Sequence, residues 1–163
     1  MSISARIQEV KVGMYTMCLV IKNDHVLLLN RSNERGFPGW IGPGGKIDFP
    51  ESLTEGAIRE VWEETGLRVI DIVYKGLDEY VDPQQNERYM VFNYVATSFD
   101  GELLSDPPEG ELRWIPIQEA MSYPMQPWFR RRFPFFFEEG TFEIYEIWDE
   151  KNQTTVKESI KRI

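Results

Sequence analysis

The chain has 163 residues, and its 27 aspartates and glutamates against 18 lysines and arginines give a formal net charge of −9. This length is enough for one domain, and 42% hydrophobic residues place the chain among ordinary globular proteins. The acidic balance argues against sequence-independent nucleic-acid binding, which needs a basic surface. A single cysteine, Cys18, excludes an intrachain disulfide framework. No apolar run could span a membrane and no signal-peptide pattern is present, so we expect a cytoplasmic protein with no membrane partner.

The first part of the chain predicts a β-hairpin, an irregular loop and a helix. Apolar runs at residues 15–21 and 26–29 flank a short turn at Asn23 and Asp24, a pattern typical of a hairpin. Residues 36–45 are so rich in glycine and proline that we expect irregular structure there. Residues 52–65 have helical periodicity, with a capping box at Ser52 and Glu55 and a stop at Gly66.

The rest of the chain predicts further strands and two helices. We expect strands at residues 69–74, 77–81, 88–97, 111–115 and 141–148, and helices at 117–121 and 128–138. The tail at 149–163 is polar, and we expect it to be partly disordered. These expectations give one domain over residues 1–163 with its core at about 12–148.

The helix at 52–65 carries an unusual carboxylate cluster. Glu60, Glu63 and Glu64 are three or four residues apart, so they are neighbours on the helix surface and repel one another. They also lie at the negative end of the helix dipole, where cations are favoured. A solvated surface face would explain any such helix. A bound hard cation such as Mg²⁺, Mn²⁺ or Ca²⁺ would explain both why the carboxylates lie close together and why they lie at the negative end of the helix.

A glycine-rich loop directly precedes this helix. Gly42, Gly44 and Gly45 let the backbone approach a ligand closely and present its carbonyl and N–H groups. Each glycine alone is explained by a tight turn. Together with the carboxylate cluster, however, the loop strengthens the prediction of a metal site.

Residues 45–67 match the motif G-x5-E-x7-R-E-U-x-E-E-x-G-U, in which U is aliphatic, so the chain resembles the Nudix hydrolase family. The resemblance implies an α+β fold of the Nudix type, an α/β/α sandwich around a mixed sheet. It also implies hydrolysis of a nucleoside diphosphate linked to another group. The cofactor implied is Mg²⁺ or Mn²⁺.

The resemblance assigns roles to the residues of the motif. Glu60, Glu63 and Glu64 are expected to ligate the metal, with the carbonyl of Gly44 as a further ligand. Arg59 is expected to orient these glutamates by ion pairing, and Glu51 resembles a carboxylate that braces the loop.

Many members of the family carry one more carboxylate beyond the motif, as a metal ligand or general base. Glu109 is our candidate, by its place just before the strand that contains Trp114, and Asp106 and Glu111 are alternatives. A solvated acidic loop would explain these residues equally well. The general base of the reaction could be Glu63, Glu64 or Glu109.

Further features are the strand YTMCLV, the segment RGF-x-GW-x-G-x-GGK, a strand with Trp114 after an acidic loop, and the run FPFFF before a last strand. In these the chain resembles the MutT-type branch of the family, which hydrolyses nucleoside triphosphates, including oxidised purine forms such as 8-oxo-dGTP, to a monophosphate and pyrophosphate. We expect Gly45, Phe37, Tyr80 and Trp114 to contact the substrate, with Trp128 as a further stacking candidate and Asn93 as a candidate for base recognition. Core packing is the alternative for each aromatic residue.

Two departures put the oxidised-purine preference in doubt. Ile41 stands where many members of the branch have an asparagine, and the aspartate pair of part of the branch is missing near residues 127–129. The run from Arg130 to Arg132 could contact phosphates or form a solvated helix face. Rival substrates are ADP-ribose, a nucleotide sugar or a capped RNA 5′ end, and a binding module without catalysis is the rival of another class. The expected partner is a small nucleotide, and the oligomeric state is left open between monomer and homodimer.

Overall fold

The computed structural model describes residues 9–32 and 38–163, in which nine strands form one mixed sheet. The sheet has the order β3-β2-β1-β6-β5-β8-β9, with β4 added to β1 and β7 to β2. The pairs β1–β6 and β5–β8 are parallel and the other pairs are antiparallel. The strands are β1 (Lys11–Lys22), β2 (His25–Arg31), β3 (Gly39–Ile41), β4 (Gly44–Lys46), β5 (Leu67–Asp82), β6 (Glu87–Gly101), β7 (Gly110–Pro116), β8 (Phe142–Asp149) and β9 (Thr154–Arg162).

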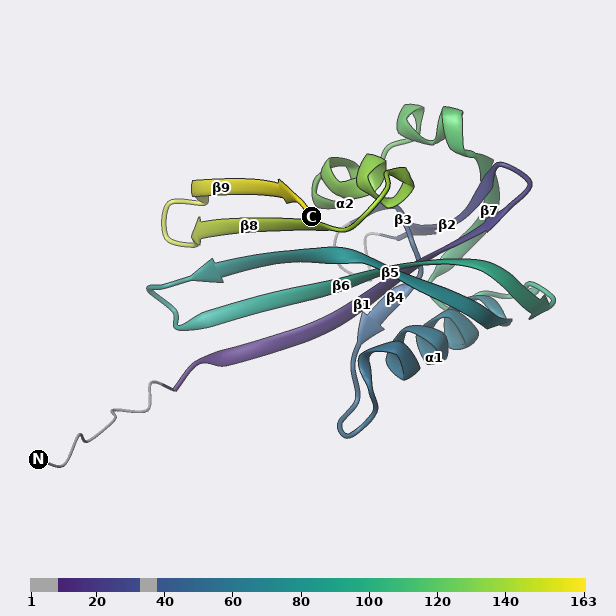
Figure 1. Ribbon diagram of the computed structural model, residues 1–163, viewed down its shortest axis with the longest axis horizontal. Coiled ribbons are helices and arrows are strands. Elements are labelled where there is room, and N and C mark those ends of the chain that lie inside the picture. The colour runs from purple at the N-terminus through teal and green to yellow at the C-terminus, as the bar shows by residue number, and fades with distance from the viewer. Residues whose placement is uncertain (1–8, 33–37) are drawn as a thin grey trace, which may run out of the picture.

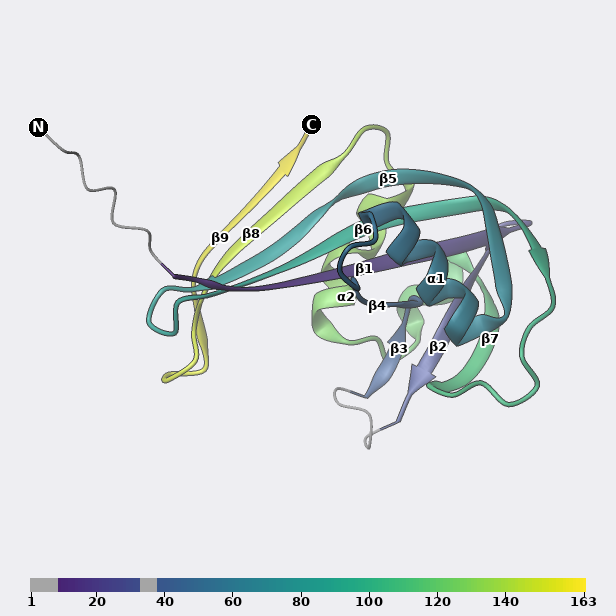
Figure 2. The same cartoon turned by 90° about the horizontal axis from the view of Figure 1, so that it is seen from below.

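Helices cover both faces of this sheet (Figures 1 and 2). The helix α1 (Leu53–Thr65) lies on one face. The short helix α2 (Pro127–Arg132) lies on the other face, followed directly by the 3₁₀ helix η3 (Phe133–Phe137). A second 3₁₀ helix, η2 (Ile117–Ser122), follows β7. The expected α+β fold, with an α/β/α arrangement around a mixed sheet, is confirmed. In the described residues, no helix is both long and apolar enough to cross a membrane.

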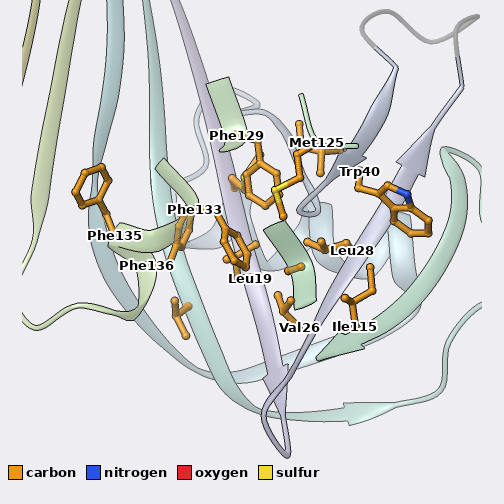
Figure 3. Close-up of a cluster of buried hydrophobic side chains, with 14 of the residues drawn as sticks. Leu19, Val26, Leu28, Trp40, Ile115, Met125, Phe129, Phe133, Phe135 and Phe136 are labelled. Carbon is orange, nitrogen blue, oxygen red and sulfur yellow. The ribbon is translucent and has the colours of Figure 1, made fainter. Parts of the chain in front are cut away.

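Two hydrophobic clusters hold the layers together, one on each face of the sheet. Successive residues of a strand point to opposite faces, and in β1 Leu19 belongs to the cluster under α2 and η3, whereas Cys18 belongs to the cluster under α1. The first cluster is built around Phe129, which is fully buried and packs edge-on against Phe133 at 5.5 Å (Figure 3). Both helical layers are therefore fixed to the same strand from opposite sides.

The predicted hairpin and helix ends are confirmed. In β1 and β2, Lys22 pairs with His25 across a turn in which Asn23 and Asp24 both have positive φ, of 49° and 60°. Ser52 caps α1 and forms the capping box with Glu55. Gly66 ends the helix in the left-handed conformation, with φ of 83°.

Three predictions of local structure are wrong. The segment 36–45 was expected to be irregular, but its described part contains β3 and the start of β4, because backbone pairing with β2 and β1 does not depend on side chains. The two strands expected at 69–74 and 77–81 are one bulged strand, β5, with a register shift between Tyr74 and Gly76. The expected helix at 128–138 divides into α2 and η3, because Pro134 has no N–H to continue an α-helix.

The prediction of a partly disordered tail is also wrong. Residues 154–162 form β9, which pairs antiparallel with β8 along its length. Its side chains are mostly exposed, so the strand buries little apolar surface and leaves no hydrophobic alternation in the sequence. Backbone hydrogen bonds and polar contacts to β8, such as Thr155 Oγ1 to Glu146 at 2.6 Å, hold it in place.

Candidate active site

The carboxylates of α1 meet the backbone of β4 at very short range. The N–H of Gly44 donates to Glu64 Oε2 at 3.1 Å. A Cβ atom added to Gly45 would lie 2.5 Å from the carboxyl carbon of Glu60. No side chain fits between strand and helix at Gly45, whereas a Cβ atom on Gly44 would collide with the backbone of β1 at Thr16.

Arg59 joins three of the acidic side chains around it. Its Nη2 lies 2.6 Å from Glu51 Oε1, and its Nη1 lies 2.9 Å from Glu60 Oε1 and 3.1 Å from Glu63 Oε2. Glu51 also accepts a hydrogen bond from the backbone N–H of Asp48 at 2.7 Å. The hydrogen bonds from Arg59 and Asp48 lower the pKa of Glu51 to about 2. Arg59 thus contacts two glutamates of the cluster, and Glu51 links Arg59 to the loop at Asp48. Their roles as orienting and bracing residues stay predictions.

Two carboxylates of the cluster are desolvated. Burial raises the pKa of Glu64 to about 8, and the nearby charges of Glu60 and Glu109 add to this, while the N–H of Gly44 and the charge of Arg31 oppose it. Burial also raises the pKa of Glu60, against the hydrogen bond from Arg59. A bound cation would reverse both shifts, because it stabilises the ionised carboxylate.

The donor set suits a hard divalent cation, but its atoms are not gathered around one point. Within residues 9–32 and 38–163, no three acidic, histidine or cysteine side chains converge on a position that could hold a metal ion. Glu63 is 55% exposed and its carboxylate turns toward Arg59. Carboxylates and a backbone carbonyl are oxygen donors of the kind that Mg²⁺ prefers. The residues therefore fit such an ion by the chemistry of their donor atoms.

The structure separates the three candidates for the additional carboxylate. Glu109 is half-buried just before β7, close enough to Glu64 to raise its pKa. Glu111 instead pairs with Arg113, and Asp106 is exposed on the loop. Of the three, Glu109 is the one that the fold brings to the cluster.

A cavity of about 610 Å³ opens on the other side of β4, which we call the glycine strand because it begins with Gly44 and Gly45. Gly44 and Gly45 line one end of it, and Ile41 and Thr16 lie beside them. Its walls come from β1, β5, β6, α2 and the turn between β8 and β9. The same two glycines therefore contact both the carboxylate cluster and the cavity.

Tyrosine rings form one wall of the cavity. Tyr80 stacks on Tyr89 with ring centres 4.8 Å apart and planes 19° apart, and Tyr15 lies beyond Tyr89 at 6.3 Å. All three line the cavity, as does Trp128. The fold thus places the predicted contact Tyr80 where a planar ligand could stack on it.

Two other candidates for substrate contact, Trp114 and Asn93, do not line the cavity. Trp114 does not line it but packs on Phe99 with ring centres 5.8 Å apart, in the cluster under α1. Phe37 lies outside the described residues. Asn93 is fully buried, and its amide nitrogen donates to the carbonyls of Gly76 and Val91, so it stabilises the bulge in β5.

Arg131 and Arg132, in the run at 130–132, are held by ion pairs along the cavity. Arg132 is 5% exposed and donates to Asp78 at 3.0 Å. Arg131 lies 3.1 Å from Asp78 and 2.6 Å from Glu146. These ion pairs tie α2 to β5 and β8 along the cavity, so a solvated helix face is wrong for these two arginines. Contact with phosphates stays a prediction, because both side chains line the cavity and their buried Nε atoms have no acceptor among the described residues.

Arg31 is a candidate site residue that sequence reasoning missed. It ends β2, lines the cavity and lies near enough to Glu64 to lower its pKa. Its Nε is buried and has no acceptor among the described residues. A lone arginine at a strand end belongs to no motif, so only the fold could reveal that it faces the glycine strand.

A mixed sheet between two helical layers, with a glycine strand against a carboxylate helix, defines a Nudix-type hydrolase fold. The family profile described as "NUDIX domain" matches residues 13–136, and the chain belongs to this family of hydrolases. The chain is 35% identical over 115 residues to the uncharacterized Nudix hydrolase YvcI of Bacillus subtilis, covering 69% of this chain and 71% of that protein.

Further comparisons point to the MutT type. A solved structure of a MutT protein from Bacillus halodurans has a TM-score of 0.77 at 29% identity, and the match covers 91% of this chain and 97% of that one. The oxidized purine nucleoside triphosphate hydrolase of Mus musculus is 40% identical over 62 residues, which is 38% of this chain and 39% of that protein. The protein is thus a MutT-like Nudix hydrolase.

Proposed function

We propose that the chain is a Mg²⁺- or Mn²⁺-dependent pyrophosphohydrolase that converts a nucleoside triphosphate to the monophosphate and pyrophosphate by attack of water on phosphorus. The observation that carries this proposal is the double contact of Gly44 and Gly45, with the carboxylates of α1 on one side and the cavity on the other. A nucleotide whose base enters the cavity would bring its phosphates to the carboxylates.

The metal would be held by Glu60, Glu63 and Glu64, with the carbonyl of Gly44. When bound, such an ion neutralises phosphate charge and lowers the pKa of a bound water. Arg59 holds the carboxylates of Glu60 and Glu63 close together by its ion pairs. Because of these ion pairs, its removal would let the carboxylates separate by like-charge repulsion.

Proton removal from the attacking water needs a carboxylate within reach of the phosphates. Glu63, Glu64 and Glu109 remain the candidates, and Glu109 is supported by its closeness to Glu64. Arg31 would contact a phosphate oxygen, because its buried Nε lacks an acceptor among the described residues beside the glycine strand. Gly45 would let the phosphates approach the backbone.

The base would stack on the tyrosine wall, with Tyr80 as the contact. Support for a preference for 8-oxo-dGTP comes from the relative in mouse, whose name refers to oxidized purine nucleoside triphosphates. Ile41 lines the cavity and offers no hydrogen bond, so recognition of an oxidised base would depend on other groups.

A substrate panel tests the proposal. We expect kcat/KM with Mg²⁺ to be higher for dGTP, 8-oxo-dGTP or dATP than for ADP-ribose and UDP-glucose. Glu64→Gln should lower the rate for every substrate, whereas Glu143→Gln, which changes a carboxylate outside the cavity, should not. A value for ADP-ribose above that of every triphosphate would contradict the proposed substrate class.

A further inference from the structure

The cavity has two ends of different charge. The end at the glycine strand carries Arg31, whereas the far end carries the carboxylates of Asp82, Glu87 and Glu150. The far end lies where β5 and β6 run beyond the helices toward the turn between β8 and β9 (Figure 1). A ligand that spans the cavity therefore passes from a cationic to an acidic environment.

The arginines in the middle of the cavity do not neutralise this acidic end. Arg132 is paired with Asp78, and Arg131 is shared among Asp78, Glu146 and Glu158. Their charge is balanced by the buried carboxylates of Asp78 and Glu146 and by the exposed carboxylate of Glu158. The negative charge of Glu87 and Glu150 is thus left to act on whatever occupies the far end.

The nearest contacts of these carboxylates leave their charge largely intact. Glu87 lies 3.8 Å from Lys11 Nζ, but the Lys11 side chain is 70% exposed, and a surface pair of this kind contributes little. Glu150 accepts a hydrogen bond from the indole N–H of Trp148 at 2.7 Å, a neutral donor. Asp82 accepts from the backbone N–H groups of Gln84 and Gln85.

Aromatic faces and carboxylates act on the same volume. Burial raises the pKa of Tyr80 to about 12, with contributions from Tyr89 and Tyr15 and from the charges of Glu87 and Glu150. Both glutamates therefore lie near enough to the Tyr80 hydroxyl to act on it, and both line the same cavity as its ring. The face of a tyrosine ring attracts a cation by its quadrupole, and carboxylates nearby add to this attraction.

We propose that the far end of the cavity selects a planar base that carries a positive charge, as alkylation of a ring nitrogen produces. Stacked tyrosines accept any planar ring, so the selectivity comes from Glu87 and Glu150, which penalise an anion and favour a cation. This inference rests on the proposed function in that the ring is the base of a nucleotide. It names alkylated nucleotides as the substrate class for that same site.

Binding of nucleosides tests the inference separately from hydrolysis. The probes are 1-methyladenosine against adenosine and 3-methylcytidine against cytidine, at neutral pH and without metal. In each pair the methylated member is a cation and the parent is neutral. Dissociation constants are measured by tryptophan fluorescence, with Trp128 and Trp148 at the cavity as reporters.

We expect each cationic nucleoside to bind about 3- to 30-fold more tightly than its neutral parent, the range of a cation–π contact. The double variant Glu87→Gln with Glu150→Gln should remove this preference while both parents bind as before. Tyr80→Leu should weaken binding of all four nucleosides. The control Glu143→Gln changes a β8 carboxylate that does not line the cavity and should retain the preference.

Equal binding within the pairs overturns the inference, as does a preference that survives in the double glutamine variant. An equal loss of the preference in Glu143→Gln also overturns the inference. The preference would then depend on the net charge of the protein and not on Glu87 and Glu150. The proposed function is contradicted by a different result, the absence of triphosphate hydrolysis. If no triphosphate is hydrolysed while the preference is present, the binding site stands without the activity.

Discussion

At the scale of single residues, Gly45 decides how closely α1 can approach the glycine strand. Its missing side chain is what lets the carboxylate of Glu60 lie against the backbone, since a Cβ atom would be 2.5 Å from the carboxyl carbon and from Oε2. Glu60 also has Arg59 on its other side at 2.9 Å. The carboxylate is therefore held between a backbone and a guanidinium group.

Gly45→Ala is expected to displace this carboxylate and to lower kcat by at least about 100-fold, because misplacement of a site group by about 1 Å can cost that much. The variant should remain folded by circular dichroism, since the glutamate is a flexible side chain at the edge of the core. Near-normal turnover at saturating Mg²⁺ would show that Glu60 has no part in the site. Thr54→Ala, at the far end of α1, serves as the control.

Cys18 gives a second prediction at this scale. The thiol is fully buried in β1, and burial raises its pKa to about 12. Because the thiolate is the reactive form, the native protein should not react with a thiol reagent at pH 8, whereas the protein in denaturant should react once per chain. Rapid reaction of the native protein would contradict the burial of β1.

At the scale of elements, α1 and the loop before it form one polar unit. Ser52 and Glu55 close the start of the helix, and Glu51 and Arg59 tie the loop to its middle. The motif of residues 45–67 therefore encodes a local structure as well as a site. The sequence could predict this unit because nearly all of its contacts are between residues close together in the chain.

The ion pair of Glu51 predicts how stability depends on pH. Arg59 and the Asp48 N–H lower the pKa of Glu51 to about 2, below the value of about 4.3 for an unfolded glutamate. The folded state thus favours the ionised form. The stabilisation is complete above about pH 4.3 and is lost as the pH falls toward 2.

The measurement compares the unfolding free energies of the wild type and of Glu51→Gln across this range. Their difference should be constant from pH 8 to 5, shrink below about pH 4.3 and vanish near pH 2. A difference that grows on acidification would have the wrong sign for a carboxylate paired with Arg59.

The cap of α1 gives a further test at this scale. Ser52→Ala removes the side chain that accepts from the N–H of Glu55 at 3.1 Å and should lower the free energy of unfolding by about 1 kcal/mol. Ser105→Ala, on an exposed loop, should change it by less than about 0.5 kcal/mol. Chemical denaturation measures both. Equal effects would mean that the cap contributes nothing.

Elements that depend on contacts between residues far apart in the chain are harder to predict from the sequence. The hairpin of β1 and β2 and the helix α1 carry local signals, namely alternation, turn residues and caps. The strand β9 carries none, because its place depends on backbone pairing with β8 and on contacts such as Arg131 with Glu158. For the same reason the cavity role of Arg31 and the burial of Arg132 could be found only in the folded chain.

At the scale of the whole molecule, the sheet brings the motif of residues 45–67 and the cavity close together, although many of their residues are far apart in the chain. Residues of the motif lie on one side of the glycine strand, and the cavity on its other side is closed by α2 and by the turn between β8 and β9. Trp148 and Gln153 line its far end. The last part of the chain therefore lines the proposed substrate cavity as well as completing the sheet.

Truncation after Glu150 tests this connection. Loss of β9 would expose the edge of β8 and remove the contacts of Glu158 and Thr155 with Arg131 and Glu146. We expect the shortened protein to have a lower melting temperature and a raised KM, with a smaller effect on kcat because the carboxylate cluster is retained. An unchanged KM in a folded truncated protein would separate the cavity from substrate binding.

The central claim is that this cluster and this cavity act on one nucleoside triphosphate. It is tested most directly by product analysis of dGTP hydrolysis with Mg²⁺, with and without a chelator, in wild type and Glu64→Gln. The account predicts dGMP and pyrophosphate in equal amounts from the wild type, and neither product with chelator or in the variant. Release of dGDP and inorganic phosphate, or undiminished turnover in Glu64→Gln, would contradict it.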